Sequence, residues 1–219
     1  PDSERIWKEI SEGKINAGGF SLNGGWVPLY NIHKTYAGLR DAYLIAGNEE
    51  AKQMLIDLTD WMIDITANLS EAQIQEMLKS EHGGLNETFA DVYKITGDKK
   101  YLDLAYDFTQ KQVLDPLEHE KDILNGMHAN TQIPKVIGYE TIAALDQNKD
   151  YHNAATYFWE NVVNNRTVSI GGNSVREHFH PADDFSSMIN SVQGPETCNT
   201  YNMLKLSEKL FLAIQKKNI

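Results

Sequence analysis

The sequence predicts an all-α protein made of consecutive helical hairpins, and three observations support this fold class. A similar segment recurs at Ile45, Ile95 and Leu145, a period of about 50 residues that is typical of stacked helical units. Each copy contains the residue types that end one helix and start the next. Apolar residues on both sides of each copy follow helical spacing, which predicts helices with one buried face.

Each copy of the repeat predicts a helix end, a turn and a new helix. Gly47 and Gly97 suit the left-handed position that follows a helix, and Asn48 and Asp98 suit the N-cap of the next helix. The third copy, which contains Asn148, is a weaker match. The apolar positions shared by the copies are Leu39/Phe89/Tyr139, Ala42/Val92/Ile142 and Ile45/Ile95/Leu145 before the turn, and Met54/Leu104/Ala154, Leu55/Ala105/Ala155 and Leu58/Phe108/Phe158 after it.

Two further helices complete the predicted architecture. Ser70 and Gln73 form a capping-box pair, so a short helix is expected to run from Ser70. Apolar spacing near Met203–Ile214 indicates the first helix of a fourth hairpin, and Pro195 suits the first turn of that helix. Three hairpins and this helix predict either an open solenoid or an arc of an (α/α) toroid. We interpret residues 1–219 as a single incomplete domain of about three and a half helical hairpins.

Composition excludes several classes of protein. The 219 residues are 41% hydrophobic, enough for a sizeable core, yet no apolar run reaches the roughly 20 residues of a membrane span. A net charge of -11 at pH 7 argues against nucleic acid or an anionic membrane as partner. The one cysteine rules out an internal disulfide framework. No signal peptide is visible after Pro1, but the chain does not open on Met, so the compartment stays open.

Polar residues precede or begin the first helix of each predicted hairpin. His33, His82 and His128 do so in the first three hairpins, and Glu196 and Cys198 do so in the fourth. In a closed ring of hairpins these helix starts converge at one end, so the five side chains would face one pocket. The alternative is that each histidine is an ordinary capping or packed residue.

Glu196 and Cys198 form the most distinctive pair in the chain. Both are expected near a helix N-terminus, whose partial positive charge favours a carboxylate and a thiolate. A carboxylate and a thiolate two residues apart can ligate one metal ion. The alternative is that Cys198 is a small buried hydrophobe, since two ligands do not make a site.

Residues 164–190 interrupt the repeat. A glycine-rich loop around Gly171 and Gly172 leads to Glu177, His178 and His180. Long loops on a rigid scaffold often carry catalytic groups, and the alternative is a mobile, solvated connection. The loop lacks both the GxGxxG pattern and the P-loop lysine, so it is not predicted to cradle a phosphate.

Four motifs together resemble one known family. They are WVPLYNIHK at 26–34, GGLNE at 83–87, HANTQIP at 128–134 and ETCNTYNML at 196–204. Their residues and order resemble those of the β-L-arabinofuranosidase-type glycoside hydrolases, families 127 and 146, long catalogued as a domain of unknown function. The resemblance runs from Arg5 to Phe211, and it does not specify the sugar.

This resemblance implies an (α/α)6 barrel and a retaining glycosidase whose cysteine nucleophile is held on zinc by one Glu and three Cys. By motif position, Glu196 and Cys198 are similar to the zinc-binding Glu and the first Cys, which makes zinc the implied cofactor. Glu177, in the loop before Glu-x-Cys, is a looser match to the general acid/base. The residues implied to bind the sugar are His33, His82 and His128, and Asn130 is expected to help them hold furanose hydroxyls.

The implied chemistry accounts for these residue types. Zinc coordination holds a thiol as thiolate near neutral pH. That thiolate would attack the anomeric carbon while Glu177 donates a proton to the leaving oxygen, and the same Glu would then activate water. In the family the nucleophilic Cys lies well downstream of Glu-x-Cys. We therefore expect an internal fragment with half a zinc site, inactive alone on arabinofuranosides and prone to self-association through exposed apolar ends.

Two functions of other kinds stay open. A toroidal enzyme could use carboxylates only, for example Glu177 with Asp183 or Asp184. A carbohydrate-binding module would need neither metal nor catalysis, and its aromatic side chains would stack on sugars. The candidates for such stacking are Trp26, Tyr30 and Tyr201.

Overall fold

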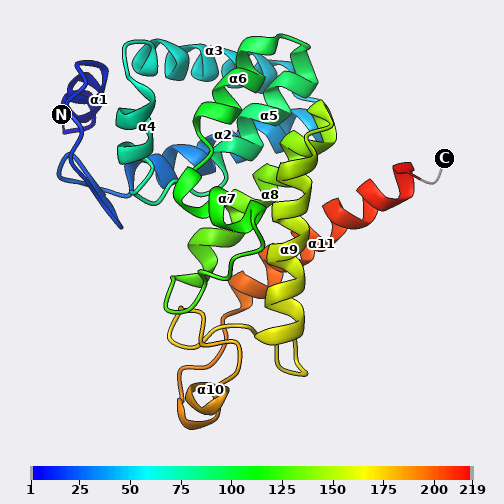
Figure 1. Ribbon diagram of the computed structural model, residues 1–219. Coiled ribbons are helices and arrows are strands. Elements are labelled where there is room, and N and C mark those ends of the chain that lie inside the picture. Colours follow the sequence, from blue (N-terminus) through cyan, green and yellow to red (C-terminus); the bar gives the residue numbers. More distant parts are fainter. Residues whose placement is uncertain (1, 218–219) are drawn as a thin grey trace. The chain divides into compact units, whose positions relative to one another are not determined.

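The computed structural model describes residues 2–217, the side chains of 216 and 217 excepted. Within these residues it has eleven helices and one small sheet (Figure 1). The described chain is 65% helical, which confirms the predicted all-α class. The chain divides into two compact units, residues 1–110 and residues 111–219. The interpretation of the chain as a single incomplete domain stays a prediction.

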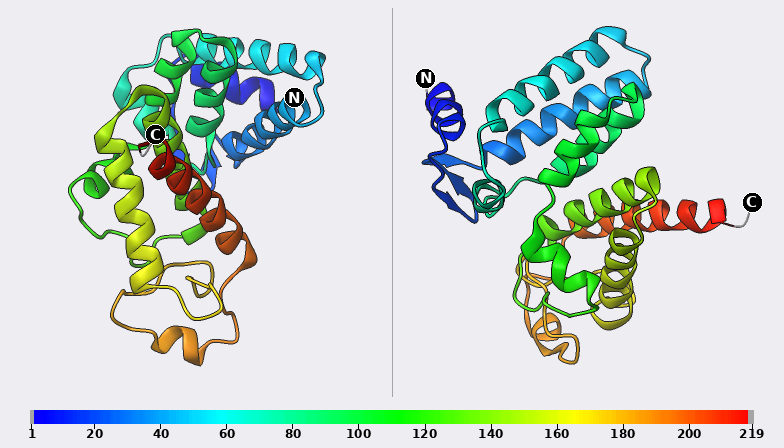
Figure 2. Two further views of the ribbon diagram at one scale, coloured as in Figure 1. Left: turned by 90° about the vertical axis from the view of Figure 1, so that its right-hand side faces the viewer. Right: turned by 45° about the horizontal axis from the view of Figure 1, so that its top comes forward.

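Unit 1 contains two helical hairpins preceded by one helix and a small sheet. The elements are α1 Asp2–Ser11, β1 Ala17–Gly18, β2 Ser21–Leu22, β3 Gly25–Trp26, α2 Pro28–Leu44, α3 Glu49–Thr66, α4 Glu71–Met77, α5 Leu85–Thr96 and α6 Lys99–Asp107. α2 pairs with α3, and α5 pairs with α6. α2 and α5 also lie side by side, so the first helices of the two hairpins are neighbours (Figure 2).

The predicted turns of unit 1 are confirmed. Gly47 and Gly97 have left-handed backbone conformations, with φ of 67° and 75°. Asn48 and Asp98 cap the next helices, because each side chain accepts a hydrogen bond from a backbone N–H of the first turn. The helix boundaries here follow from local sequence, as capping requires.

Two smaller elements of unit 1 differ in how well the sequence predicts them. Ser70 and Gln73 form the full capping box at the start of α4, as expected. The antiparallel sheet, in the order β1-β2-β3, was not predicted. Its strands are two residues long, and such short segments show no alternation that a pattern could reveal.

Aromatic side chains build the core of unit 1. Tyr36 and Phe89 meet edge to face with centroids 5.2 Å apart, and Phe89 meets Phe108 in the same way at 5.0 Å. Not every position of the repeat is buried. Ile45 and Met54 are 83% and 52% exposed, so the expectation that the first copy buries its whole stripe was wrong.

Unit 2 is built around one central helix. Its elements are α7 Lys111–Glu118, α8 Ala129–Asp146, α9 Lys149–Asn165, α10 Ser186–Asn190 and α11 Thr197–Lys217. α8 packs against both α9 and α11, and α7 covers α9. The repeat positions Tyr139 and Phe158 are fully buried here, together with Phe179 from the long loop.

The helix starts of unit 2 are close to those predicted. Asn148 caps α9 by accepting hydrogen bonds from the N–H groups of Asp150 and Tyr151. α11 begins at Thr197, so Pro195 and Glu196 precede the helix. The expectation that Pro195 occupies the first turn was therefore wrong by two residues, a common error at helix ends.

α11 exposes more large apolar side chains than α8, the helix against which it packs. Met203, Leu206 and Leu210 are buried, whereas several large apolar side chains face outward. These are Tyr201, Leu204, Phe211, Leu212 and Ile214. In the part of the chain that the structure describes, no helix combines the length and hydropathy that crossing a membrane would take.

Candidate active site

Unit 1 brings the two histidine segments of its hairpins together. His33 lies in the second turn of α2 and is 7% exposed, and His82, just before α5, is fully buried. The ring of His33 lies against the backbone of Gly83, where a methyl group would stand only 2.3 Å from His33 Nδ1. Gly83 has φ of 58°, which disfavours other residues. A glycine is therefore needed at position 83 for the His33 ring to approach the backbone this closely.

The His82 segment is held in place by one local and one long-range hydrogen bond. His82 Nδ1 lies 3.0 Å from the carbonyl oxygen of Ser80, and Glu81 N donates to Gly19 O at 2.8 Å. The second contact ties the segment to the turn between β1 and β2. Two of the predicted sugar-binding histidines thus stand on adjoining, fixed segments of unit 1.

Unit 2 brings His128 and Glu177 together although 49 residues separate them. His128 is the residue that precedes α8, and its Nε2 lies 3.3 Å from Glu177 Oε2. Ala129 N also donates to the carbonyl oxygen of Glu177 at 2.8 Å. The start of α8 therefore positions both the backbone and the side chain of Glu177.

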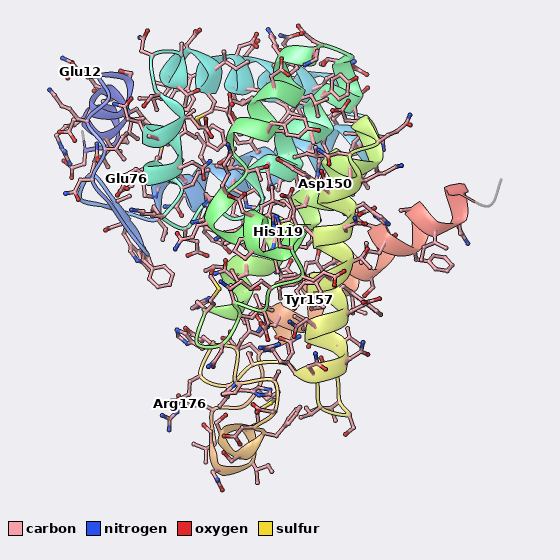
Figure 3. The ribbon with its side chains drawn as sticks, in the orientation of Figure 1. Glu12, Glu76, His119, Asp150, Tyr157 and Arg176 are labelled. Atoms are coloured by element: carbon pink, nitrogen blue, oxygen red, sulfur yellow. The ribbon has the colours of Figure 1, made fainter. Side chains whose placement is uncertain are left out.

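The backbone at Glu177 is in an uncommon conformation. Arg176 and Glu177 have φ of 47° and 67°, a region that residues with a Cβ rarely adopt. The Glu177 side chain is 57% exposed, and Arg176 points away from the body of unit 2 (Figure 3). Strain of this kind is often found where a fold holds a reactive side chain in position.

His178 belongs to the same cluster, although sequence reasoning did not select it as a site residue. It forms isolated β-bridges with His128 and with Val175. The rings of His178 and His128 meet edge to face with centroids 5.3 Å apart. Its place next to Glu177 was the available signal, and the pairing with a residue 50 positions earlier was not visible in the sequence.

Glu196 and Cys198 are in contact at the start of α11. Cys198 Sγ donates to Glu196 Oε2 at 3.4 Å, and Asn199 Oδ1 lies 3.8 Å from the same sulfur. Partial burial raises the pKa of the Cys198 thiol, and the hydrogen bond to the Glu196 carboxylate raises it further. Without a cation at this position, the pair is thus a thiol that donates to a carboxylate.

Cys198 Sγ and Glu196 Oε2 are suitably spaced to bind one zinc ion. A thiolate sulfur and a carboxylate oxygen on a tetrahedral zinc lie roughly 3.5 Å apart, close to the 3.4 Å found between Sγ and Oε2. No third His, Cys, Asp or Glu joins them within the described residues 2–217. The donor chemistry therefore fits two of the four ligands of a zinc site.

A buried carboxamide, that of Asn199, connects the start of α11 to the loop between α9 and α10. Asn199 is fully buried, and its Nδ2 donates to Ser174 Oγ at 2.6 Å. A Cβ at Gly172 would lie 2.2 Å from the ring of Pro195, so the Gly172 backbone is in close contact with this ring. The segment that leads to Glu177 is thereby held against the segment that carries Cys198.

The first turn of α8 and the second turn of α11 are also joined directly. Asn202 Nδ2 donates to Asn130 Oδ1 at 2.8 Å, which places the predicted sugar-binding carboxamide beside the helix of Cys198. Asn202 comes four residues after Cys198, so both face the same side of α11. That spacing was the signal that could have identified Asn202.

The predicted site residues thus form three groups. His33 lies with the His82 segment in unit 1. His128 lies with Glu177, and Glu196 lies with Cys198, both in unit 2 and linked through Asn130. The prediction that all of them face one pocket is not tested by groups described within separate units.

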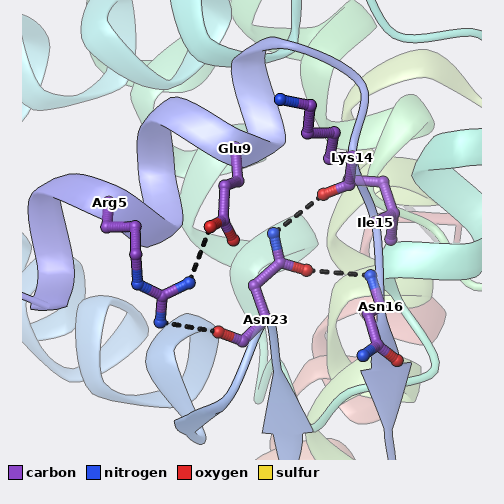
Figure 4. A pocket seen from close by; sticks show the side chains of 6 residues that line it. All are labelled: Arg5, Glu9, Lys14, Ile15, Asn16 and Asn23. Carbon is purple, nitrogen blue, oxygen red and sulfur yellow. Dashed lines mark hydrogen bonds and ion pairs between the residues drawn. The ribbon is translucent and has the colours of Figure 1, made fainter.

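A pocket of about 450 Å³ between α1 and the sheet lies apart from these groups (Figure 4). Arg5 pairs with Glu9 at 2.7 Å and donates to Asn23 O at 3.0 Å. The Asn23 side chain bonds to the backbones of Lys14 and Asn16 at 2.8 Å each. The side chains of Arg5, Glu9 and Asn23 are therefore paired with one another or with nearby backbone, and the Arg5–Asn23 bond connects α1 to the turn between β2 and β3.

Together these observations define an all-α protein whose helix starts present carboxylate, imidazole, carboxamide and thiol groups. Such groups transfer protons, bind sugars and ligate zinc. The chain belongs to the family described as β-L-arabinofuranosidase, GH127 catalytic domain, whose model matches residues 7–219. It is thereby assigned to the glycoside hydrolases, and its helical fold agrees with that family. A comparison with curated proteins found no match.

Proposed function

We propose that the chain supplies part of the active site of a retaining glycoside hydrolase that acts on β-L-arabinofuranosides. The observation that carries the proposal is the double pairing in unit 2. His128 meets Glu177 at the start of α8, and Cys198 meets Glu196 at the start of the neighbouring α11. Proton transfer and metal ligation are thus served by adjacent helix starts of one unit.

Glu177 has the role of general acid and base in this proposal. Its carboxyl group donates a proton to the leaving oxygen and later takes one from the attacking water. The exposed carboxylate is open to water, and the contact with His128 Nε2 orients it. His33, His82, His128 and Asn130 hold the hydroxyls of the arabinofuranosyl group.

Glu196 and Cys198 would hold zinc, which when bound keeps cysteine ligands in the thiolate form. The sequence has one cysteine, and it pairs with Glu196 as a ligand would. We therefore place the nucleophilic cysteine outside these 219 residues and expect no turnover by this chain alone.

The carboxylate-only alternative is less well supported. The Asp184 carboxylate accepts a hydrogen bond from Ser186 N at 2.8 Å, at the start of α10. The Asp184 carboxylate therefore takes part in a local contact within the loop. Glu177 lies instead against an imidazole, a partner suited to orienting a carboxyl group that must exchange a proton.

The test is binding of methyl β-L-arabinofuranoside to the chain, measured by calorimetry with the α-anomer as control ligand. His128→Ala and Asn130→Ala should weaken binding of the β-anomer, whereas Arg176→Ala, next to Glu177 but pointing away, should not. Equal binding of both anomers, or no effect of either substitution, would contradict the proposal. Release of nitrophenol from p-nitrophenyl β-L-arabinofuranoside by the chain would refute the placement of the nucleophile.

A further inference from the structure

Trp26 differs from the other tryptophans of the chain in its exposure. It ends β3 with its side chain 79% exposed. The other three are partly buried: Trp7 and Trp61 meet edge to face with centroids 5.0 Å apart, and Trp159 donates to Ser207 Oγ at 2.7 Å. An aromatic ring of this size gains much from contact with a partner.

The backbone beside Trp26 favours this outward position. Val27 has φ of 43° and ψ of 47°, and its own side chain is only 6% exposed. A β-branched residue in the left-handed region is a conformational outlier that persists only where its surroundings impose it. Here Val27 N donates to Phe20 O, and Asn31 N donates to Val27 O, each at 3.0 Å. These bonds hold the turn in which Val27 faces inward and Trp26 faces outward.

The same turn begins the helix that carries a predicted sugar-binding residue. Tyr30 and His33 follow Trp26 by four and seven residues, and their rings lie 6.3 Å apart. Tyr30 and His33, three residues apart, share one face of α2, and Trp26 precedes this helix at the end of β3. Exposure rises toward the start of α2, from the buried His33 through the half-buried Tyr30 to Trp26, which precedes the helix and is exposed.

We propose that Trp26 is a specificity-determining residue whose indole face stacks on the sugar to which the arabinofuranosyl group is attached. The inference rests on the proposed function, in which His33 contacts the arabinofuranosyl group itself. The next sugar of the ligand then lies beyond the start of α2, toward Trp26. The apolar C–H face of a neutral sugar suits an indole ring, and the chain's net charge of -11 disfavours an acidic one.

The test uses the purified chain, the methyl glycoside and a disaccharide in which β-L-arabinofuranose is linked to a second sugar. Acrylamide quenching of tryptophan fluorescence should report mainly on Trp26, and Trp26→Phe should remove the readily quenched fraction. The disaccharide should protect this fraction, and the methyl glycoside should not. Trp26→Ala should weaken disaccharide binding about tenfold, the effect of losing one well-buried aromatic contact, and leave binding of the methyl glycoside unchanged.

Ile45→Ala is the matched control, because Ile45 is an equally exposed apolar residue at the other end of α2. It should change neither affinity, and Trp26→Phe should fall between the wild type and Trp26→Ala. If the methyl glycoside binds and Trp26→Ala leaves disaccharide affinity unchanged, this inference is wrong and the proposed function stands. If the methyl glycoside also protects Trp26, the residue lies in the arabinofuranose site and its assignment to the second sugar is wrong. If neither ligand binds, both proposals fail for this chain.

Discussion

Asn202 and Asn130 are joined by a hydrogen bond of 2.8 Å between two side chains that lie 72 residues apart in the sequence. The bond connects the second turn of α11 with the first turn of α8, and the starts of these two helices carry Cys198 and His128. A shift of either helix would therefore move the candidate metal ligands relative to the candidate sugar-binding residues. This coupling makes Asn202 a positioning residue in the proposed site.

Asn202→Ala should accordingly weaken binding of methyl β-L-arabinofuranoside. Loss of one net hydrogen bond, worth about 1 kcal/mol, corresponds to a roughly fivefold rise in Kd. Calorimetry on the variant and on Asn153→Ala, an exposed asparagine of α9, checks the effect. An unchanged Kd for Asn202→Ala would show that Asn130 is placed by other contacts.

Gly83→Ala should destabilise unit 1 and displace His33. The added methyl group would lie 2.3 Å from His33 Nδ1, at a backbone φ of 58°. Strain of this type costs about 1–3 kcal/mol, measurable by urea denaturation. Gly38→Ala is the control, since Gly38 is in α2 with open space around it, and alanine there should stabilise the helix by about 0.5–1 kcal/mol. Equal stabilities of the two variants would contradict the packing of His33 on Gly83.

Zinc should protect Cys198 from alkylation. The chain has one cysteine, so the rate of labelling by iodoacetamide reports on this thiol alone. Zn²⁺ should slow labelling, a chelator should restore it, and Mg²⁺, which prefers oxygen ligands, should have little effect. Glu196→Gln should reduce the protection, because its carboxylate is the second ligand. Protection that is undiminished in Glu196→Gln would show that Glu196 does not take part.

The sequence predicts local features of this fold better than distant contacts. Gly47, Asn48 and the other turn residues act on their own helix ends, so their effect is readable from a few neighbours. The Glu196–Cys198 contact is similarly local. The contact of His128 with Glu177 depends on the path of a 49-residue connection, which no spacing rule describes. Burial of Ile45 also failed as a prediction, because a repeat pattern indicates which face is apolar and not whether another element covers it.

Apolar exposure along α11 predicts self-association. Leu204 and Phe211 are 64% and 58% exposed, and they lie seven residues apart on one face of the helix. Contact between such faces removes apolar surface from water, which favours association. Light scattering across a concentration range should show a rise in mass that Leu204→Glu with Phe211→Glu abolishes. Ile170→Glu, at an exposed loop residue, should leave the rise unchanged, and a monomer at all concentrations would refute the prediction.

A buried arginine should make the stability of unit 2 depend on pH. Arg166 is 1% exposed, and it donates to Asp122 Oδ2 at 2.6 Å, to His180 O at 3.1 Å and to Asn161 Oδ1. Burial opposes ionisation of Asp122, but the hydrogen bonds from Leu124 N and Arg166 outweigh it and lower the pKa of Asp122. The pair therefore ties the loop near His180 to the start of the segment before α8.

The direction of the pH effect follows from that lowered pKa. A carboxyl group with a lower pKa in the folded state adds stability above its unfolded pKa of about 3.9, and the contribution is lost as pH falls through the folded value. The Asp122→Asn variant should thus be less stable than the wild type at pH 7 by about 2 kcal/mol. This loss is smaller than the usual cost of breaking a buried ion pair, because the Asp122 side chain is partly exposed. The difference from the wild type should shrink as pH falls below about 4. Urea denaturation at several pH values measures this difference in stability, and Asp183→Asn, at an exposed residue, is the control. A difference that stays constant with pH would show that Arg166 is not held by the Asp122 charge.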